Sequence, residues 1–96
     1  MIFLDLDVAV TADNDTPREN DNVVFTCTPT TSEDDLTYEW YVDTVKIPSE
    51  TGATYTLTGG TRNETVKKYE CKVTATNSSL VQTSDEKSVT FLCKYH

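Results

Sequence analysis

The chain has 96 residues, which is the size of one domain, and its hydrophobic fraction of 36% leaves a thin core. Its formal net charge of −8 repels phosphates and anionic lipids, so nucleic acids and membrane surfaces are not expected as partners. No stretch is long and apolar enough to insert into a membrane, and residues 1–4 lack the basic start of a signal peptide.

Alternating apolar and polar residues predict seven short strands, because side chains along a strand point to opposite faces in turn. The first predicted strand runs from Phe3 to Thr11 and ends at a polar turn around Pro17. The other predicted strands span residues 23–28, 36–42, 45–47, 54–58, 68–75 and 87–94.

The connections between these strands contain residues that are typical of turns. Gly59 and Gly60 predict a turn with a positive φ, and residues 76–86 are expected to form a long polar connection. Strands spaced roughly ten residues apart, without a helical pattern, predict an all-β sandwich. The whole chain, residues 1–96, is therefore expected to be a single domain, as one module of a longer or multimeric protein.

The spacing of two cysteines, a tryptophan and a tyrosine is the most specific pattern in the chain. Cys27 and Cys71 lie 44 residues apart, each in the middle of a predicted strand. Trp40 follows the first cysteine by 13 residues, and Tyr69 precedes the second by two. Taken together, these positions resemble the immunoglobulin-like family over nearly the whole length of the chain.

This resemblance implies an immunoglobulin-like antiparallel sandwich with a Cys27–Cys71 disulfide between its sheets. Trp40 would pack on the disulfide, and the Tyr69 hydroxyl would donate a hydrogen bond to nearby backbone, as in the family's tyrosine corner. All four residues are therefore expected to be core residues. Thr65 stands where the family often has an aspartate, so the family's Asp–Arg salt bridge is not expected here.

The third cysteine, Cys93, has no partner in this pattern. It could be a buried free thiol, form an intermolecular bridge, or belong with a neighbouring segment that the sequence does not include. In a reducing compartment all three cysteines would stay reduced, and Cys27 and Cys71 would then only pack in the core.

Residues that carry catalysis or bind metals are scarce. The single histidine, His96, is the last residue, and the adjacent carboxylates Asp34 and Asp35 lie in a polar loop, so no enzyme activity is expected. Neither a zinc spacing nor a glycine-rich phosphate loop is present, so no cofactor is predicted. The acidic and amide residues in 13–15 and 19–22 are compatible with calcium, but turn chemistry explains them better.

Three Asn-x-Ser/Thr triplets begin at Asn14, Asn63 and Asn77, and they would be glycosylation acceptors if the protein were secreted by a eukaryotic cell.

Three segments, 38–43, 53–57 and 72–77, are similar to immunoglobulin-like domains of tailed-phage virion proteins of the outer-capsid decoration type. This resemblance implies a binding or adhesion module on the virion surface that attaches weakly to a host cell, with a cell-surface or virion protein or carbohydrate as its partner. The alternatives are an extracellular ectodomain of a receptor, adhesion protein or secreted viral glycoprotein, and a structural spacer in a tandem array.

A binding surface is expected where side chains and loops face solvent. Tyr41 is predicted to point outward and is the leading candidate, and Glu70 and Lys72 share the solvent face of a neighbouring strand. The loops 29–35 and 77–85 are the other candidates.

Overall fold

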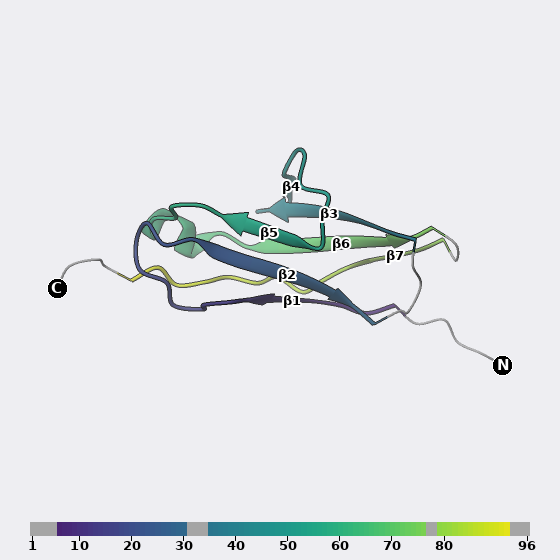
Figure 1. Cartoon of the computed structure of the whole chain (residues 1–96), viewed down its shortest axis with the longest axis horizontal. Coiled ribbons are helices and arrows are strands. Elements are labelled where there is room, and N and C mark those ends of the chain that lie inside the picture. Colours follow the sequence, from purple (N-terminus) through teal and green to yellow (C-terminus); the bar gives the residue numbers. More distant parts are fainter. Residues whose placement is uncertain (1–5, 31–34, 77–78, 93–96) are drawn as a thin grey trace.

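Two antiparallel sheets pack face to face in the computed structural model, which describes residues 6–30, 35–76 and 79–92 (Figure 1). The three-stranded sheet has the order β1 (Val8–Ala12), β2 (Val23–Pro29), β5 (Thr54–Leu57). The four-stranded sheet has the order β4 (Val45–Lys46), β3 (Leu36–Val42), β6 (Tyr69–Ala75), β7 (Leu80–Thr83). This two-layer arrangement confirms the predicted all-β sandwich.

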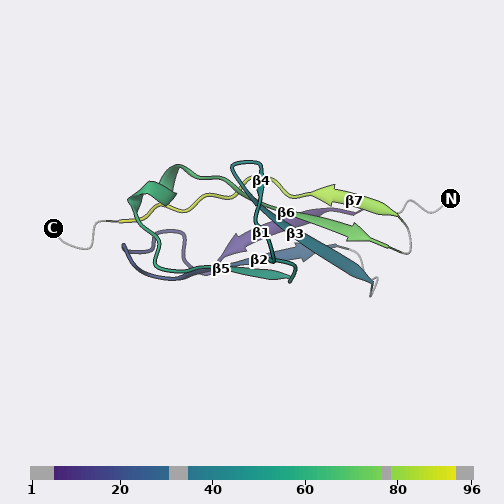
Figure 2. The ribbon, with the colours of Figure 1, turned by 90° about the horizontal axis from the view of Figure 1, so that it is seen from above.

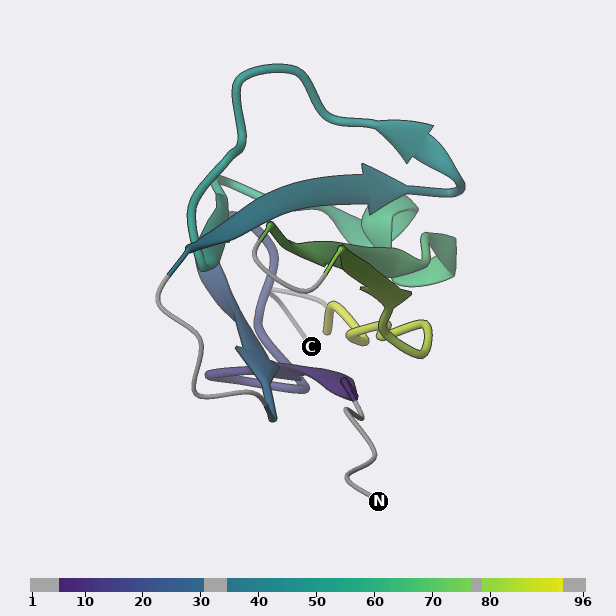
Figure 3. The ribbon, with the colours of Figure 1, turned by 90° about the vertical axis from the view of Figure 1, so that its right-hand side faces the viewer.

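The sandwich is elongated, with dimensions of 57 × 25 × 20 Å. The described part of the chain starts toward one end of the long axis, in purple, and stops toward the other, in yellow, as Figures 1 and 2 show. Figure 3 looks along this axis, with β1 and β2 on one side of the core and β3 and β4 on the other. The domain therefore has two poles and two outer sheet faces.

Hydrophobic alternation explains which side of each central strand faces the core. β6 alternates strictly between buried and half-buried residues, and Trp40 of β3 lies opposite Cys71 of β6. A side-chain period of two residues places every second residue of such a strand inside. The buried hydrophobic cluster consists of Leu6, Val23, Phe25, Cys27, Trp40, Tyr69, Cys71, Val73, Val89 and Phe91.

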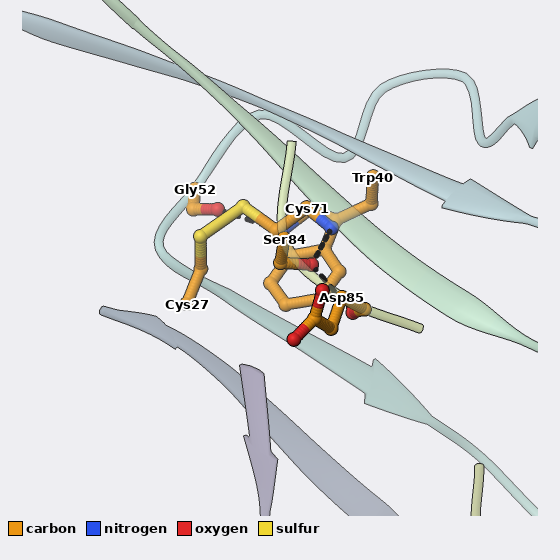
Figure 4. Close-up of a disulfide and its surroundings, with 6 residues drawn as sticks. All are labelled: Cys27, Trp40, Gly52, Cys71, Ser84 and Asp85. Carbon is orange, nitrogen blue, oxygen red and sulfur yellow. Dashed lines mark hydrogen bonds between the residues drawn. A yellow bond between two sulfur atoms is a disulfide. The ribbon is translucent and has the colours of Figure 1, made fainter. Parts of the chain in front are cut away.

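A disulfide between Cys27 of β2 and Cys71 of β6 links the two sheets, with 6.1 Å between the Cα atoms (Figure 4). A disulfide across 44 residues stabilises the fold by about 3–4 kcal/mol, because it lowers the conformational entropy of the unfolded chain. Trp40 is fully buried beside it, and its Nε1–H donates a hydrogen bond to the Gly52 carbonyl at 2.9 Å. Trp40 thus anchors the β4–β5 connection as well as filling the core.

Tyr69 is buried among other aromatic rings, and its role differs from the expected one. Its ring stacks on Phe25 with 4.5 Å between centroids and also lies near Tyr55. Throughout the described ranges, the Tyr69 hydroxyl makes no hydrogen bond to backbone, so the predicted tyrosine-corner bond is wrong. Burial raises the pKa of this phenol well above its ordinary value.

The C-terminal part of the chain also differs from the prediction. The expected connection 76–86 contains strand β7, and the expected strand 87–94 is not continuous over its described residues 87–92. Between the pairs Lys72–Thr83 and Tyr69–Lys87, β6 advances three residues while the other segment advances four. The extra residue is a bulge, which interrupts regular pairing.

Ser84 organises this bulge. Its Oγ accepts a hydrogen bond from the Cys71 N–H at 3.0 Å and donates one to the Asp85 carbonyl at 3.0 Å (Figure 4). Ser84 is the buried polar residue of the described core, with 5% of its surface exposed. Its hydroxyl therefore satisfies a backbone group beside the disulfide that the bulge would otherwise leave unpaired.

Beyond the bulge, the chain crosses to the segment that follows β1. Thr90 N–H donates to the Asp15 carbonyl and Leu92 N–H to the Pro17 carbonyl, at 2.9 and 2.8 Å. Leu92 and Arg18 form a parallel bridge. The region around Pro17, which was predicted as a turn, therefore also pairs with the C-terminal segment. Val89 and Phe91 of that segment are buried, as their alternation indicates.

A 3-10 helix, η1 (Arg62–Val66), precedes β6 and was not expected. Thr61 accepts a hydrogen bond from the Asn63 N–H, and Glu64 accepts one from the Thr61 N–H, which forms a capping box. That backbone donor, followed by Lys67, lowers the pKa of Glu64. The Thr-x-x-Glu pattern was the sequence signal for this turn.

The two glycines before η1 have different roles. Gly59 has φ of +60°, as expected for this turn, and its N–H donates to Asn22 Oδ1. Gly60 is required by contact, because a Cβ there would lie 2.3 Å from the Phe91 ring. Thr65 Oγ1 accepts from the Phe91 N–H at 2.9 Å, which fixes the same ring from the η1 side.

Replacing Ser84 with alanine should lower the free energy of unfolding by about 1–3 kcal/mol, because the buried Cys71 N–H loses its acceptor. Urea denaturation monitored by Trp40 fluorescence measures this loss. Ser88→Ala, at an exposed position of the same segment, is the control and should change stability by less than about 0.5 kcal/mol. Equal effects of the two variants would contradict the role given to the Ser84 hydroxyl.

Candidate functional site

The outer face of the four-stranded sheet carries a shallow hollow of about 240 Å³. Strands β3, β6 and β7 and the β3–β4 turn line it with Tyr41, Thr44, Glu70, Lys72 and Thr83. The register explains this grouping, because Tyr41 lies opposite Glu70 and Lys72 lies opposite Thr83. The three adjacent strands therefore bring these outward-facing residues together.

A charged network centred on Glu39 borders the hollow. Glu39 forms an ion pair of 2.9 Å with Lys46 of β4 and a longer contact of 3.9 Å with Lys72 of β6. The Tyr41 hydroxyl donates a hydrogen bond to Glu39 Oε1 at 3.2 Å. The hydrogen bond from Lys46 is the main reason that the pKa of Glu39 is lowered, with smaller contributions from Tyr41 and Lys72. This network restrains Tyr41 and Lys72.

Glu70 differs from its neighbours on this face. Over residues 6–30, 35–76 and 79–92, its carboxylate makes neither a hydrogen bond nor an ion pair. Lys46 and Lys72 on this face both contact Glu39, and the exposed Lys68, two residues before Glu70, makes no ion pair with it. The hollow thus contains a half-buried carboxylate with an unused capacity to accept hydrogen bonds.

The rim of the hollow is formed by a strained turn. Asp43 and Thr44 connect β3 to β4 with φ of +50° and +67°. A two-residue hairpin turn of this type normally takes Asn or Gly, and a β-branched residue at positive φ is an outlier. Asp43 holds the turn in place, because its Oδ1 accepts from the Lys68 N–H at 2.9 Å and its own N–H donates to the Lys68 carbonyl.

Tyr41 is thus the predicted surface residue that the structure places at the hollow, together with Glu70 and Lys72. Thr44 and Thr83 were not singled out from the sequence. Thr44 had a signal in its position after Asp43 between two predicted strands, whereas Thr83 depends on β7, which was not predicted. Of the candidate loops, residues 31–34 and 77–78 lie outside the described residues.

The three glycosylation triplets have different outcomes. Asn14 and Asn63 are exposed, and the Asn14 side chain accepts a hydrogen bond from the Thr16 N–H at 3.0 Å. Asn77 lies outside the described residues, as do Cys93 and His96. Glycosylation at all three asparagines stays a prediction.

Polar side chains of the two turns considered for calcium accept backbone hydrogen bonds. Asp13 Oδ1 accepts from the Val24 N–H, and Asp21 Oδ2 accepts from the Arg18 N–H, each at 3.0 Å. In the described part of the chain, no group of three or more acidic, cysteine or histidine side chains is arranged to hold a metal. These turns therefore use their oxygens for local structure.

Comparison with known proteins gives one detailed similarity. No protein-family model matches the chain, and no curated protein is significantly similar to it. Among solved structures, the three N-terminal domains of the bacteriophage RB49 highly immunogenic outer capsid protein (Hoc) match with a TM-score of 0.72 and 21% sequence identity. The match covers 93% of this chain and 29% of the Hoc chain.

This chain has an immunoglobulin-like fold. The match and the two antiparallel sheets joined by the Cys27–Cys71 disulfide confirm the fold class and the resemblance to phage capsid domains. At 21% identity the comparison establishes the fold of this immunoglobulin-like domain, and its partner has to be argued from its own surface. No helix in the described ranges has the length and apolar character needed to span a membrane.

Replacing Thr44 with glycine should raise the free energy of unfolding by about 0.5–1 kcal/mol, because glycine adopts a positive φ without the steric cost that threonine has. Thermal and urea denaturation measure the change. The control is Thr58→Gly, at an exposed position that lacks a positive φ, which should destabilise the domain. A loss of stability in both variants would show that Thr44 is not strained.

Replacing Lys46 with methionine should raise the pKa of Glu39 toward the ordinary glutamate value, because the main stabilising partner of the carboxylate is removed. Since the folded pKa is lowered, the stability from this network is complete above the ordinary pKa and is lost as the pH falls through the folded pKa. NMR titration of the Glu39 carboxyl carbon measures the shift. Lys68→Met removes the same charge from the exposed Lys68 and should leave this pKa unchanged.

Proposed function

We propose that this immunoglobulin-like domain is a non-enzymatic binding module displayed on a virion surface, as a decoration of an outer capsid or tail. Its role there is weak attachment to the surface of a host cell. The observation that carries the proposal is the structural similarity to domains of an outer capsid protein. The match covers less than a third of the Hoc chain, which supports one module within a longer or multimeric protein.

The outer face of the four-stranded sheet is the proposed binding surface. Tyr41 contributes an amphipathic ring at the hollow, and the threonines, Glu70 and Lys72 contribute hydrogen-bonding groups. Open sites of this composition suit a protein or carbohydrate on a cell or virion surface, because they combine a contact area with donors and acceptors.

A purely binding role accounts for the chemistry of this site. The carboxylate of Glu39 is occupied by Lys46, Lys72 and Tyr41, and Glu70 lies at an open surface where water has access. General acid–base chemistry requires a carboxyl group with a pKa raised by a dry environment, and the pKa of Glu39 is lowered instead.

A second candidate is an ectodomain of a cell-surface receptor, adhesion protein or secreted viral glycoprotein that binds a protein ligand. The exposure of Asn14 and Asn63 favours it, because both triplets are accessible to a glycosylating enzyme.

Location distinguishes the two candidates. Antibodies raised against the domain should label the outside of intact virions from the source of this chain in immunogold electron microscopy. Labelling of a cell surface with unlabelled virions would support the ectodomain instead and contradict virion display.

Attachment is tested by adsorption of the fluorescently labelled domain to host cells, measured by flow cytometry. Tyr41→Ala should reduce adsorption by about tenfold, as expected for the loss of an aromatic contact at a binding site. The control, Thr56→Ala, lies at an exposed position of β5 in the other sheet and should adsorb like the native domain. Unchanged adsorption of the Tyr41 variant would exclude this face.

A further inference from the structure

We infer that the hollow around Glu70 is a receptor site for one cationic side chain, an arginine or lysine, of a partner protein. This inference rests on the proposed function, because it assigns the chemistry of the partner to the proposed binding face. Three steps lead to it: the unpaired charge in the hollow, the size of the hollow and the rigidity of its walls.

The first step is the distribution of charge on the outer face. Glu39 engages both Lys46 and Lys72 there, and the exposed Lys68 lies on the same side of the chain as Glu70 without forming an ion pair with it. The Glu70 carboxylate is left without a partner among the described residues, although it lines the hollow. A carboxylate without an intramolecular partner can bind a charged donor, and an arginine guanidinium can bind it with two parallel hydrogen bonds.

The aromatic residue of the hollow favours the same ligand. Tyr41 lies directly opposite Glu70 in the register of β3 and β6, so the ring and the carboxylate border one space. Aromatic rings attract ammonium and guanidinium groups, most often that of arginine. The formal charge of −8 adds a long-range attraction for a positively charged partner.

The second step is the size of the hollow. Its volume of about 240 Å³ is below the roughly 300–1,000 Å³ that is usual for small-molecule sites. The hollow is also open to solvent on its outer side. This shape accommodates the end of one side chain that a larger partner presents, with the rest of the contact on the surrounding sheet face.

The third step is rigidity. The Tyr41 hydroxyl is held by Glu39, and the turn that carries Thr44 is held by the two backbone contacts between Asp43 and Lys68. Thr44 keeps a positive φ that is unfavourable for a β-branched residue, and such strain concentrates at functional sites. The walls of the hollow are therefore set before a ligand binds, which reduces the entropic cost of binding.

The test is a titration of the purified domain with two short peptides, acetyl-Gly-Arg-Gly-amide and acetyl-Gly-citrulline-Gly-amide. Citrulline has nearly the shape of arginine and no charge. ¹H–¹⁵N NMR spectra should show shifts at Tyr41, Glu70 and Thr83 with the arginine peptide, and binding about tenfold weaker or absent with the citrulline peptide.

Two charge-matched variants locate the site. Glu70→Gln should weaken binding of the arginine peptide by about tenfold, whereas Glu86→Gln, which removes the same charge at an exposed position away from the hollow, should change it by less than about twofold. Glu70 has no intramolecular partner in the described residues, so Glu70→Gln should keep the native spectrum and stability.

Equal weakening by both variants would overturn the inference, because it would mean that net charge attracts the peptide. Equal binding of the two peptides would overturn it as well. These outcomes concern Glu70 alone, since virion labelling and cell adsorption test the proposed function independently. If the antibodies do not label virions but the domain still binds the arginine peptide, the display role is contradicted and the site for a cationic side chain is still supported.

Discussion

The disulfide between Cys27 and Cys71 is the constraint on which the rest of the domain depends. It joins the middle strand of one sheet to an inner strand of the other, and it therefore sets where the two layers meet. A chain with only 36% hydrophobic residues has a limited core, so a covalent link between the layers compensates for the apolar area it lacks. Trp40 and Ser84 complete this centre with hydrogen bonds to Gly52 and to the Cys71 backbone.

The bulge at Ser84, next to the disulfide, determines the path of the chain after β7. Because one extra residue is inserted opposite β6, the segment after β7 leaves that strand and pairs in parallel with residues near Pro17. The Lys87–Asp15 ion pair of 2.9 Å lies along the same path. Residues 90–92 are thus bonded to the segment 15–19 that follows β1, while β3, β6 and β7 keep a regular outer face on which the hollow forms.

The central strands could be predicted because their apolar and polar residues alternate regularly, whereas the irregular positions could not be predicted. β2 and β6 alternate with a period of two residues around Cys27 and Cys71, and β3 buries Trp40, so the inner sides of these strands were predicted correctly. The bulge reverses the parity: Leu80 and Ser84 pack inward at even positions, and Val89 and Phe91 at odd positions. The prediction therefore missed β7 within residues 76–86, although it placed Val89 and Phe91 on the buried side. Tyr41 was correctly predicted to face outward. The hollow also needs Thr83 of β7 and Thr44 of the β3–β4 turn, which are distant from each other in the sequence and meet only in the folded sheet.

The opposite positions of the two ends of the described chain along the long axis have a mechanical consequence. Tension applied between the two poles acts along the strands, so the parallel bridge between Arg18 and Leu92 is loaded in shear and its hydrogen bonds bear the force together. If that pairing yields, the disulfide still keeps the segment between Cys27 and Cys71 from lengthening, which withholds about 150 Å of contour length. The domain can therefore act as a short, nearly inextensible link that keeps its outer sheet face folded under load.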